Sequence, residues 1–152
     1  MTGEPNDCFI IEGQMALPYQ YFAGAVGSRF LLALRDGKKI LGVRGAKSGR
    51  TVVPPRQTCE RTFERLDQDW VEVGPEGTVT GFTVIRYREP YQPKEPPYVL
   101  ALIRLDGADS CISHLLNCGD PACAHVGMRV RAVFAEESVD NILAIRHFEP
   151  VP

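Results

Sequence analysis

Four side chains that could bind a metal lie close together in the last third of the chain. They are His114, Cys118, Cys123 and His125, and Cys111 lies just upstream. Imidazole and thiolate groups are the donors that zinc prefers, so this cluster is a candidate metal site or redox pair. Its spacing matches neither C-x-x-C nor H-x(3–5)-H, and cysteines in strands are usually small buried hydrophobes. We favour a structural role for these residues and keep a metal site as the alternative.

The sequence contains no convincing nucleophile for catalysis. Its serines lack a G-x-S-x-G setting, and Ser113 and His114 are adjacent in a predicted strand, where neighbouring side chains point to opposite faces. Cys123 and His125 could form a reactive pair, but no third group is evident to orient the base. We therefore expect no catalytic residue in this chain and no enzyme activity by the chain alone.

Basic side chains are concentrated in a run of 22 residues that contains one acid, Asp36. Gly45, Ser48 and Gly49 lie within this run and allow a close backbone approach to phosphate oxygens. The alternative interpretation is a solvated, charged surface. The candidate phosphate patch consists of Lys47, Arg50, Arg44 and Arg56. Closely spaced aromatic residues, which single-stranded nucleic-acid sites use for stacking, are absent from the run.

The elements that would position these residues are one helix followed by short strands. Apolar residues at a spacing of four from Phe22 to Leu34 predict a helix over residues 19–35, which Asp36 and Gly37 end. Two strands and a turn are predicted over residues 39–53. Five strands joined mostly by short turns fit a small closed barrel of the oligonucleotide/oligosaccharide-binding (OB) type better than a sandwich. The strands are predicted at residues 78–87, 98–105, 111–117, 128–136 and 142–148, and an acidic, mixed segment, 57–76, precedes them and contains the sequence WVEV at 70–73.

Composition limits the class of protein. The chain has 152 residues, of which 44% are hydrophobic, as expected for one globular domain. Its 17 basic and 19 acidic residues give a net charge of −2, which argues against a histone-like nucleic-acid binder. Five cysteines at irregular spacing, without a secretion signal, favour a reduced, cytoplasmic protein. No apolar run approaches the ~18 residues of a membrane span, so we expect no membrane association.

Residues 42–62 resemble a rubredoxin-like zinc ribbon with the pattern C-x-x-C-G-(x)4-P-P-R-x-x-C-x-x-C. The sequence there is GVRGAKSGRTVVPPRQTCERT. Later segments, GTVTGFTVIRY, PPYVLALIRLDGAD, HLL-(x)9-VGMRVRAVF and the closing HFEP, are similar to the same family. This family comprises the zinc-ribbon/OB-fold accessory proteins (domain of unknown function thirty-five) that partner thiolase-like enzymes. The order and spacing of several separate motifs make the resemblance specific, and it covers nearly the whole chain.

The sequence departs from the family pattern at the metal ligands. The ligand positions of the ribbon are occupied by Gly45, Ser48, Cys59 and Thr62. A structural zinc site needs four thiolate or imidazole donors, whereas glycine has no side chain and hydroxyl groups bind zinc poorly. We therefore predict a degenerate ribbon of two hairpins that binds no zinc and is held by packing and by contacts with a partner.

The resemblance implies a mainly β protein with three parts. These are an N-terminal arm and helix that dock on a partner (1–37), the degenerate ribbon hairpins (38–69) and a five-stranded OB barrel (70–152). The implied partner is a thiolase-like enzyme, with which the chain would form a hetero-oligomeric acyl-CoA C-acyltransferase complex. The small subunit of an aromatic acyl-CoA thiolase, such as 2-benzoylsuccinyl-CoA thiolase, is one such assignment. The sequence does not choose it over other acyl chains.

The chain would then shape and shield the acyl-CoA site and share the coenzyme A thioester with its partner, with no tightly bound cofactor of its own. Apolar residues outside the barrel strands support docking, because exposed aromatic patches are often interface anchors. They are Phe9, Ile10, Ile11, Tyr19, Tyr21, Phe22, Tyr91 and Tyr98. The alternative function is that of a stand-alone OB module for single-stranded nucleic acid, which the net charge disfavours.

Overall fold

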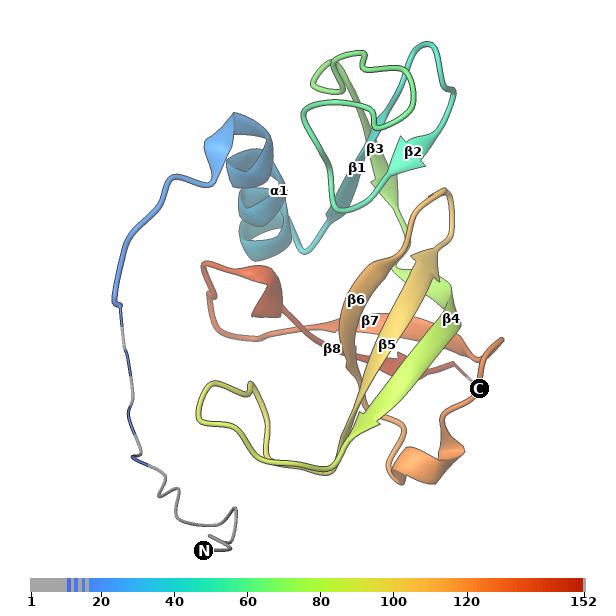
Figure 1. The fold of residues 1–152 in the computed structure, drawn as a ribbon. Coiled ribbons are helices and arrows are strands. Elements are labelled where there is room, and N and C mark those ends of the chain that lie inside the picture. Colours follow the sequence, from blue (N-terminus) through green and yellow to red (C-terminus); the bar gives the residue numbers. More distant parts are fainter. Residues whose placement is uncertain (1–10, 12, 14, 16, 152) are drawn as a thin grey trace, which may run out of the picture.

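The single α-helix in the described part of the chain begins later than the sequence predicts. The computed structural model describes residues 11, 13, 15 and 17–151, and α1 spans Gly24–Gly37 (Figure 1). Gly24 has a φ of 76°, in the left-handed region, so residues 19–23 cannot continue the right-handed helix backwards. At the other end Lys38 is left-handed, with a φ of 50°, and the Lys39 N–H donates to the Ala33 carbonyl at 3.1 Å.

A small antiparallel sheet follows the helix. Its strands are β1 (Ile40–Arg44), β2 (Thr51–Val52) and β3 (Asp69–Val73), in the order β2-β1-β3. Residues 70–73, which we assigned to the start of the OB barrel, therefore lie in a strand that pairs with β1 and not with the barrel that follows. The chain turns between the two sheets at Gly74, whose φ is 67°.

The second half of the chain forms a closed barrel. Its strand order is β4-β5-β6-β8-β7, with β7 pairing back onto β4. The strands are β4 (Glu76–Ile85), β5 (Tyr98–Leu105), β6 (Ile112–Leu116), β7 (Arg129–Phe134) and β8 (Ile145–Pro150). A five-stranded Greek-key barrel is the OB fold. The predicted mainly β class, with an N-terminal helix and an OB barrel, is confirmed.

Two short 3-10 helices lie in the barrel connections, η1 (Pro121–Cys123) and η2 (Ile142–Ala144). The second one corrects the strand predicted at 142–148, which begins only at Ile145. The cause is local: the Asn141 side chain accepts a hydrogen bond from the Leu143 N–H at 2.8 Å, which favours a turn over an extended chain.

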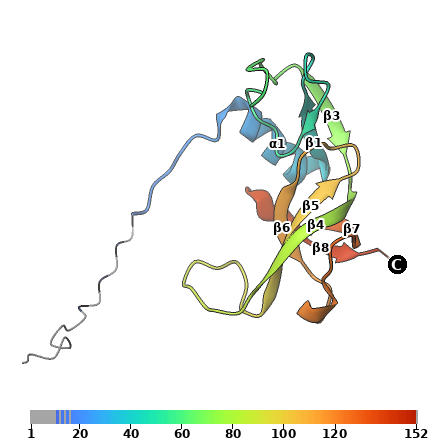
Figure 2. The ribbon, with the colours of Figure 1, turned by 45° about the vertical axis from the view of Figure 1, so that its right-hand side comes forward.

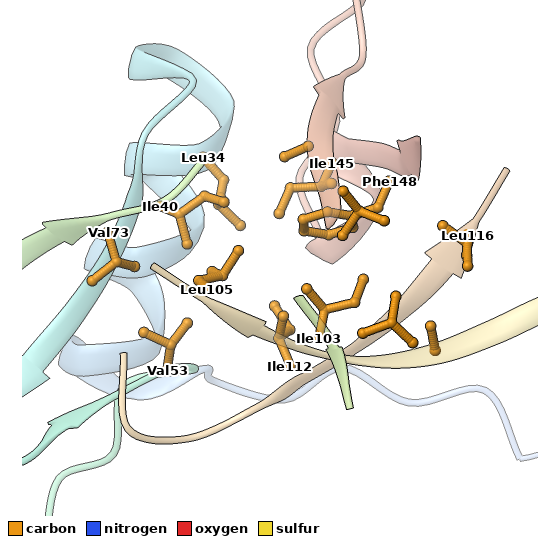
Figure 3. Packing of buried hydrophobic residues seen from close by; sticks show 14 of the residues in the cluster. Leu34, Ile40, Val53, Val73, Ile103, Leu105, Ile112, Leu116, Ile145 and Phe148 are labelled. Carbon is orange, nitrogen blue, oxygen red and sulfur yellow. The ribbon is translucent and has the colours of Figure 1, made fainter. Parts of the chain in front are cut away.

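One hydrophobic core joins the helix, the small sheet and the barrel. Leu34 of α1 packs in the same buried cluster as Ile40 of β1, Val73 of β3 and the barrel residues Ile145 and Phe148 (Figure 3). An ion pair adds to this contact, because Arg35 Nη1 lies 2.7 Å from Asp140 Oδ1 in the loop before η2. The helix is therefore part of the folded body. None of the helices in the described residues is long and apolar enough to cross a membrane.

Candidate functional site

Two similar turns bring the four ribbon ligand positions together. In the first turn the Gly49 N–H donates to the Gly45 carbonyl at 2.8 Å, and in the second the Phe63 N–H donates to the Cys59 carbonyl at 3.0 Å. Both turns end in a left-handed residue, Gly49 with a φ of 67° and Phe63 with a φ of 55°. The other two ligand positions, Ser48 and Thr62, lie one residue before these.

The carboxylate of Glu64 fills the space between the turns. Its Oε2 accepts the Lys47 N–H at 2.8 Å, while its Oε1 accepts the Ser48 N–H at 3.0 Å and the Thr62 hydroxyl at 2.9 Å. These hydrogen bonds, above all that from the Lys47 N–H, hold the pKa of Glu64 below its ordinary value. One side chain thus links the two turns, a role that the sequence pattern did not indicate.

The residues present do not fit a zinc ion. A Cβ added at Gly45 would lie 2.2 Å from Ser48 Oγ and 2.7 Å from Glu64 Oε1, so a fourth ligand has no space there. Cys59 is buried beside Val43 and Leu66, and hydrogen bonds from Thr62 are the main cause that lowers the pKa of its thiol. At the place where a zinc ribbon has its metal ion, the Glu64 carboxylate links the two turns by hydrogen bonds, an arrangement that we call the carboxylate clamp.

Replacing Glu64 with Gln is expected to loosen the small sheet, because an amide presents an N–H group to one of the backbone donors. Amide hydrogen exchange at Lys47 and Ser48 should accelerate and the melting temperature should fall, whereas Glu72→Gln on β3 should change neither. The charged form is favoured in the fold, so its stabilising effect is present above pH 4.5 and is lost as the pH falls below that value. A chelator that lowered the melting temperature of the wild type would contradict the carboxylate clamp.

The predicted phosphate patch is partly neutralised by acids of the chain itself. Arg50 Nη1 lies 3.0 Å from Glu60 Oε1, and Arg56 Nη1 lies 3.8 Å from the other oxygen of the same carboxylate. Arg44 Nε donates to Thr51 Oγ1 at 3.3 Å. Lys47 makes no ion pair with any described residue. The role of these four side chains in binding a phosphate group stays a prediction.

The histidine and cysteine cluster does not form one site. His114 is buried and stacks edge-on against Phe148, with ring centroids 5.7 Å apart. Its Nδ1 accepts the Leu115 N–H at 2.9 Å and its Nε2 lies 3.2 Å from the Ile142 carbonyl, so both ring nitrogens are engaged. Cys123 and His125 are exposed on the η1 connection. In the part of the chain that the structure describes, no group of three or more His, Cys, Asp or Glu side chains could hold a metal ion.

His114 is expected to make the fold sensitive to mild acid. Burial is the main cause that lowers its pKa below 6.5, and the nearby His147 acts in the same direction. The neutral form is therefore favoured in the fold, so its stabilising effect is full above pH 6.5 and is lost as the pH falls through the lower folded value.

The urea midpoint of the wild type should fall between about pH 7.5 and about pH 5.5. In His114→Gln the fall in the urea midpoint between these pH values should be smaller. The free energy of unfolding of this variant should also be lower than that of the wild type by about 1–3 kcal/mol at neutral pH, because its hydrogen bonds are imperfect. His125→Gln, on the exposed connection, is the matched control and should behave as the wild type. An equal pH dependence in His114→Gln and the wild type would show that this residue is not responsible.

The segment before the helix carries large apolar side chains that belong to neither buried cluster of the described residues, although the rings of Tyr19 and Tyr21 contact each other, with centroids 6.1 Å apart. Leu17, Tyr19, Tyr21 and Phe22 are all exposed, the last two to 80% and 83%. The segment leads away from the folded body, as Figure 2 shows. Of the arm residues predicted to dock, Phe9 and Ile10 lie outside the described residues, whereas Ile11 is exposed.

The apolar residues outside this segment differ in their exposure to solvent. Tyr91 is exposed on the proline-rich loop, but Tyr98, which we expected at an interface, is buried at the start of β5. Phe63 is 81% exposed at a backbone conformation that costs a bulky residue about 1–2 kcal/mol. Leu100 and Leu102 lie on the outer face of β5 and are exposed. The sequence did not predict this exposure, because β5 is apolar on both faces and its residues do not indicate which face is in contact with solvent.

Comparison with known proteins shows what this chain is similar to. A family profile described as "ChsH2, C-terminal OB-fold domain" matches residues 70–135. A "DUF35 domain-containing scaffold protein" of Methanocaldococcus jannaschii is 25% identical over 116 residues, which are 74% of this chain and 82% of that protein. Residues 70–135 thus match an OB-fold family profile, and most of the chain is similar to a DUF35 scaffold protein.

Two solved structures have a similar fold. A DUF35 family protein of unknown function from Sulfolobus solfataricus has 26% identity and a TM-score of 0.59, with 72% of this chain and 78% of that chain covered. A structure described as "Ltp2-ChsH2(DUF35) aldolase" has 23% identity and a TM-score of 0.60, with 80% of this chain and 91% of that chain covered. At this lower identity the second structure shows likeness of fold.

Proposed function

We propose that this chain is a non-catalytic accessory subunit of a thiolase-like acyl-CoA enzyme. The observation that carries the proposal is the exposed segment 17–22, which presents four large apolar side chains to solvent. Burying one such side chain stabilises a complex by about 1.5–3 kcal/mol. A segment of this kind is suited to lie on the surface of another protein.

The relatives support an accessory role. One is named a scaffold protein, and another is a DUF35 component in a structure described as an aldolase. In the described residues of this chain, no metal cluster accompanies the exposed segment. The partner would supply the reactive groups, while the barrel and the small sheet would cover the acyl-CoA entrance and keep water from the thioester. Lys47 and Arg44 would add positive charge near the nucleotide end of coenzyme A.

The nucleic-acid alternative gains little support from the barrel. OB folds bind oligonucleotides on the face of their second and third strands, which here are β5 and β6. The outward residues of these strands include the exposed Leu100 and Leu102 and the half-buried Leu115, and Arg104 is the single cation among them. A face of this composition offers apolar contact and little attraction for phosphate groups.

Native co-purification tests the proposed function. A tagged full-length chain, expressed in its own host, should retain an enzyme of thiolase type in a stoichiometric amount, and acyl-CoA turnover should require that enzyme. Turnover of an acyl-CoA by the chain alone would overturn the proposal. So would the recovery of nucleic acid in place of a protein partner, with an affinity that falls steeply as salt is added.

A further inference from the structure

A second feature of the barrel is a basic cavity at the end opposite to the small sheet. It has a volume of about 290 Å³ and lies beneath the proline-rich loop between β4 and β5, next to the start of β8. The cavity opens because β6 and β8 run parallel and pair only at Leu116 and Phe148. Beyond this pair the two strands separate, and side chains of the loop close part of the gap.

Three basic side chains from distant parts of the sequence line this cavity. Lys94 comes from the proline-rich loop, and Arg146 and His147 come from β8. Within the described residues, none of the three makes an ion pair with a carboxylate. Like charges gathered without a counterion repel one another, so the arrangement favours the binding of an anion.

The nearby acids do not neutralise this charge. Glu149 lies 3.1 Å from Arg131, and Glu95 of the loop lies 2.9 Å from Arg88. Glu136 and Glu137 line a neighbouring cavity that shares Arg146, but neither carboxylate lies within ion-pair distance of it.

The effect of this charge is visible at the imidazole. The pKa of His147 is lowered first by burial and then by the charge of Arg146, and Lys94 acts in the same direction. Glu149 alone opposes this shift. The imidazole therefore lies close to two cations, Arg146 of its own strand and Lys94 of the loop.

The remaining walls are suited to an organic ligand. Val99 and Leu116 are buried residues that form an apolar floor. Asn117 also lines the cavity, and its side-chain amide makes no hydrogen bond with any described residue. The volume lies near the lower limit of small-molecule sites. A guanidinium group and an ammonium group together match a dianion, such as a phosphate monoester, better than a single carboxylate.

We propose that this cavity binds a phosphate monoester carried on a small organic body. Arg146 and Lys94 hold the phosphate group, and the floor formed by Val99 and Leu116 contacts the organic part. The site goes beyond the proposed accessory function, because the chain alone should bind the ligand. It is also separate from the predicted patch around Lys47, which follows β1 at the far end of the molecule, whereas the loop between β4 and β5 lies at the lower left of Figure 1.

The test is a titration of the full-length, 15N-labelled chain with adenosine monophosphate, followed by amide chemical shifts. Adenosine, which lacks the phosphate group, is the matched ligand control. Adenosine monophosphate should shift the amides of Lys94, Asn117 and His147, and adenosine should leave them unchanged at the same concentration.

Arg146→Gln and Lys94→Gln should each weaken binding about tenfold or more, since each removes a charge-assisted hydrogen bond. Both side chains are exposed, so the variants should keep the wild-type melting temperature. Arg104→Gln, on the outer face of β5, is the control and should bind as the wild type does. Equal shifts with adenosine, equal weakening in Arg104→Gln, or shifts centred on Lys47 and Arg50 would overturn the proposal.

Two further ligands distinguish the source of the phosphate group. If the cavity takes the 3′-phosphate of coenzyme A, coenzyme A should bind at least about tenfold more tightly than dephospho-coenzyme A. If it takes a free nucleotide, adenosine monophosphate should bind and the two coenzymes should not differ. Either result supports a monoester site, whereas the absence of binding by all three ligands overturns it. These titrations use the chain without a partner, so their outcome does not depend on partner capture. The phosphate site and the accessory role can therefore be refuted independently of each other.

Discussion

Replacing both Tyr21 and Phe22 with serine is expected to abolish stable capture of the partner enzyme and to lower its affinity about a hundredfold or more. Large aromatic anchors at interfaces typically contribute about 2 kcal/mol or more each, and about 1.4 kcal/mol corresponds to tenfold in affinity. Both side chains are exposed and belong to no packed cluster of the chain, so the variant should melt as the wild type does. The measurement is titration of the partner enzyme with wild-type and variant chain by calorimetry.

Tyr87→Ser provides the matched control for this experiment. Tyr87 is an exposed aromatic residue just after β4, away from the segment 17–22, and its replacement should leave the affinity unchanged. Undiminished binding by the double variant would refute docking through this segment. A marked fall in its melting temperature would show that the two rings pack on the chain itself.

The second large effect is expected in the core. Leu34→Ala should lower the free energy of unfolding by about 2–5 kcal/mol, because a buried leucine leaves a cavity that its neighbours fill only in part. Leu34 is 1% exposed and lies among residues of both β-sheets. Urea denaturation should show one cooperative transition at a lower midpoint, reported alike by probes in the small sheet and in the barrel.

Leu32→Ala on the same helix is the control for Leu34→Ala. Leu32 is 46% exposed, so its truncation should change the free energy of unfolding by less than about 0.5 kcal/mol. Equal effects of the two substitutions would contradict the placement of α1 in the common core.

The position of the helix changes how the docking role of residues 1–37 should be tested. Deletion of residues 1–36 would remove Phe30 and Leu34 from the core, so a soluble barrel is not expected to remain. Deletion of residues 1–22 ends before α1, so it removes the exposed apolar segment 17–22 and leaves both buried clusters of the described residues in place. This shorter deletion should give a folded chain that does not bind the partner.

The barrel could be predicted from the sequence because its signals are local. Strand β5 is a continuous apolar run, YVLALIRL, that follows Pro97, and Gly107, with a φ of 85°, permits the turn after it. The inward side of the helix was also predicted correctly at Phe30 and Leu34. The start of the helix was wrong because the left-handed φ of Gly24 cannot be read from a run of apolar residues.

The sites were harder to predict because their contacts connect distant residues. His114 was a weak candidate metal ligand by residue type, and only the structure shows that its nitrogens bond to backbone groups of Leu115 and Ile142. Glu64 has no place in the ribbon pattern, although a glutamate close to the last ligand position of a ribbon that keeps only one cysteine, Cys59, was a signal in the sequence. The basic cavity joins Lys94 to residues some fifty positions later, which only the path of the barrel strands brings together.

The most direct measurement is the acyl-CoA turnover of the purified partner enzyme with and without this chain. The accessory role predicts no turnover by the chain alone, an increase when the wild-type chain is added, and no increase with the variant in which serine replaces both Tyr21 and Phe22. Turnover by the chain alone, or a partner whose rate is the same with and without it, would contradict that role.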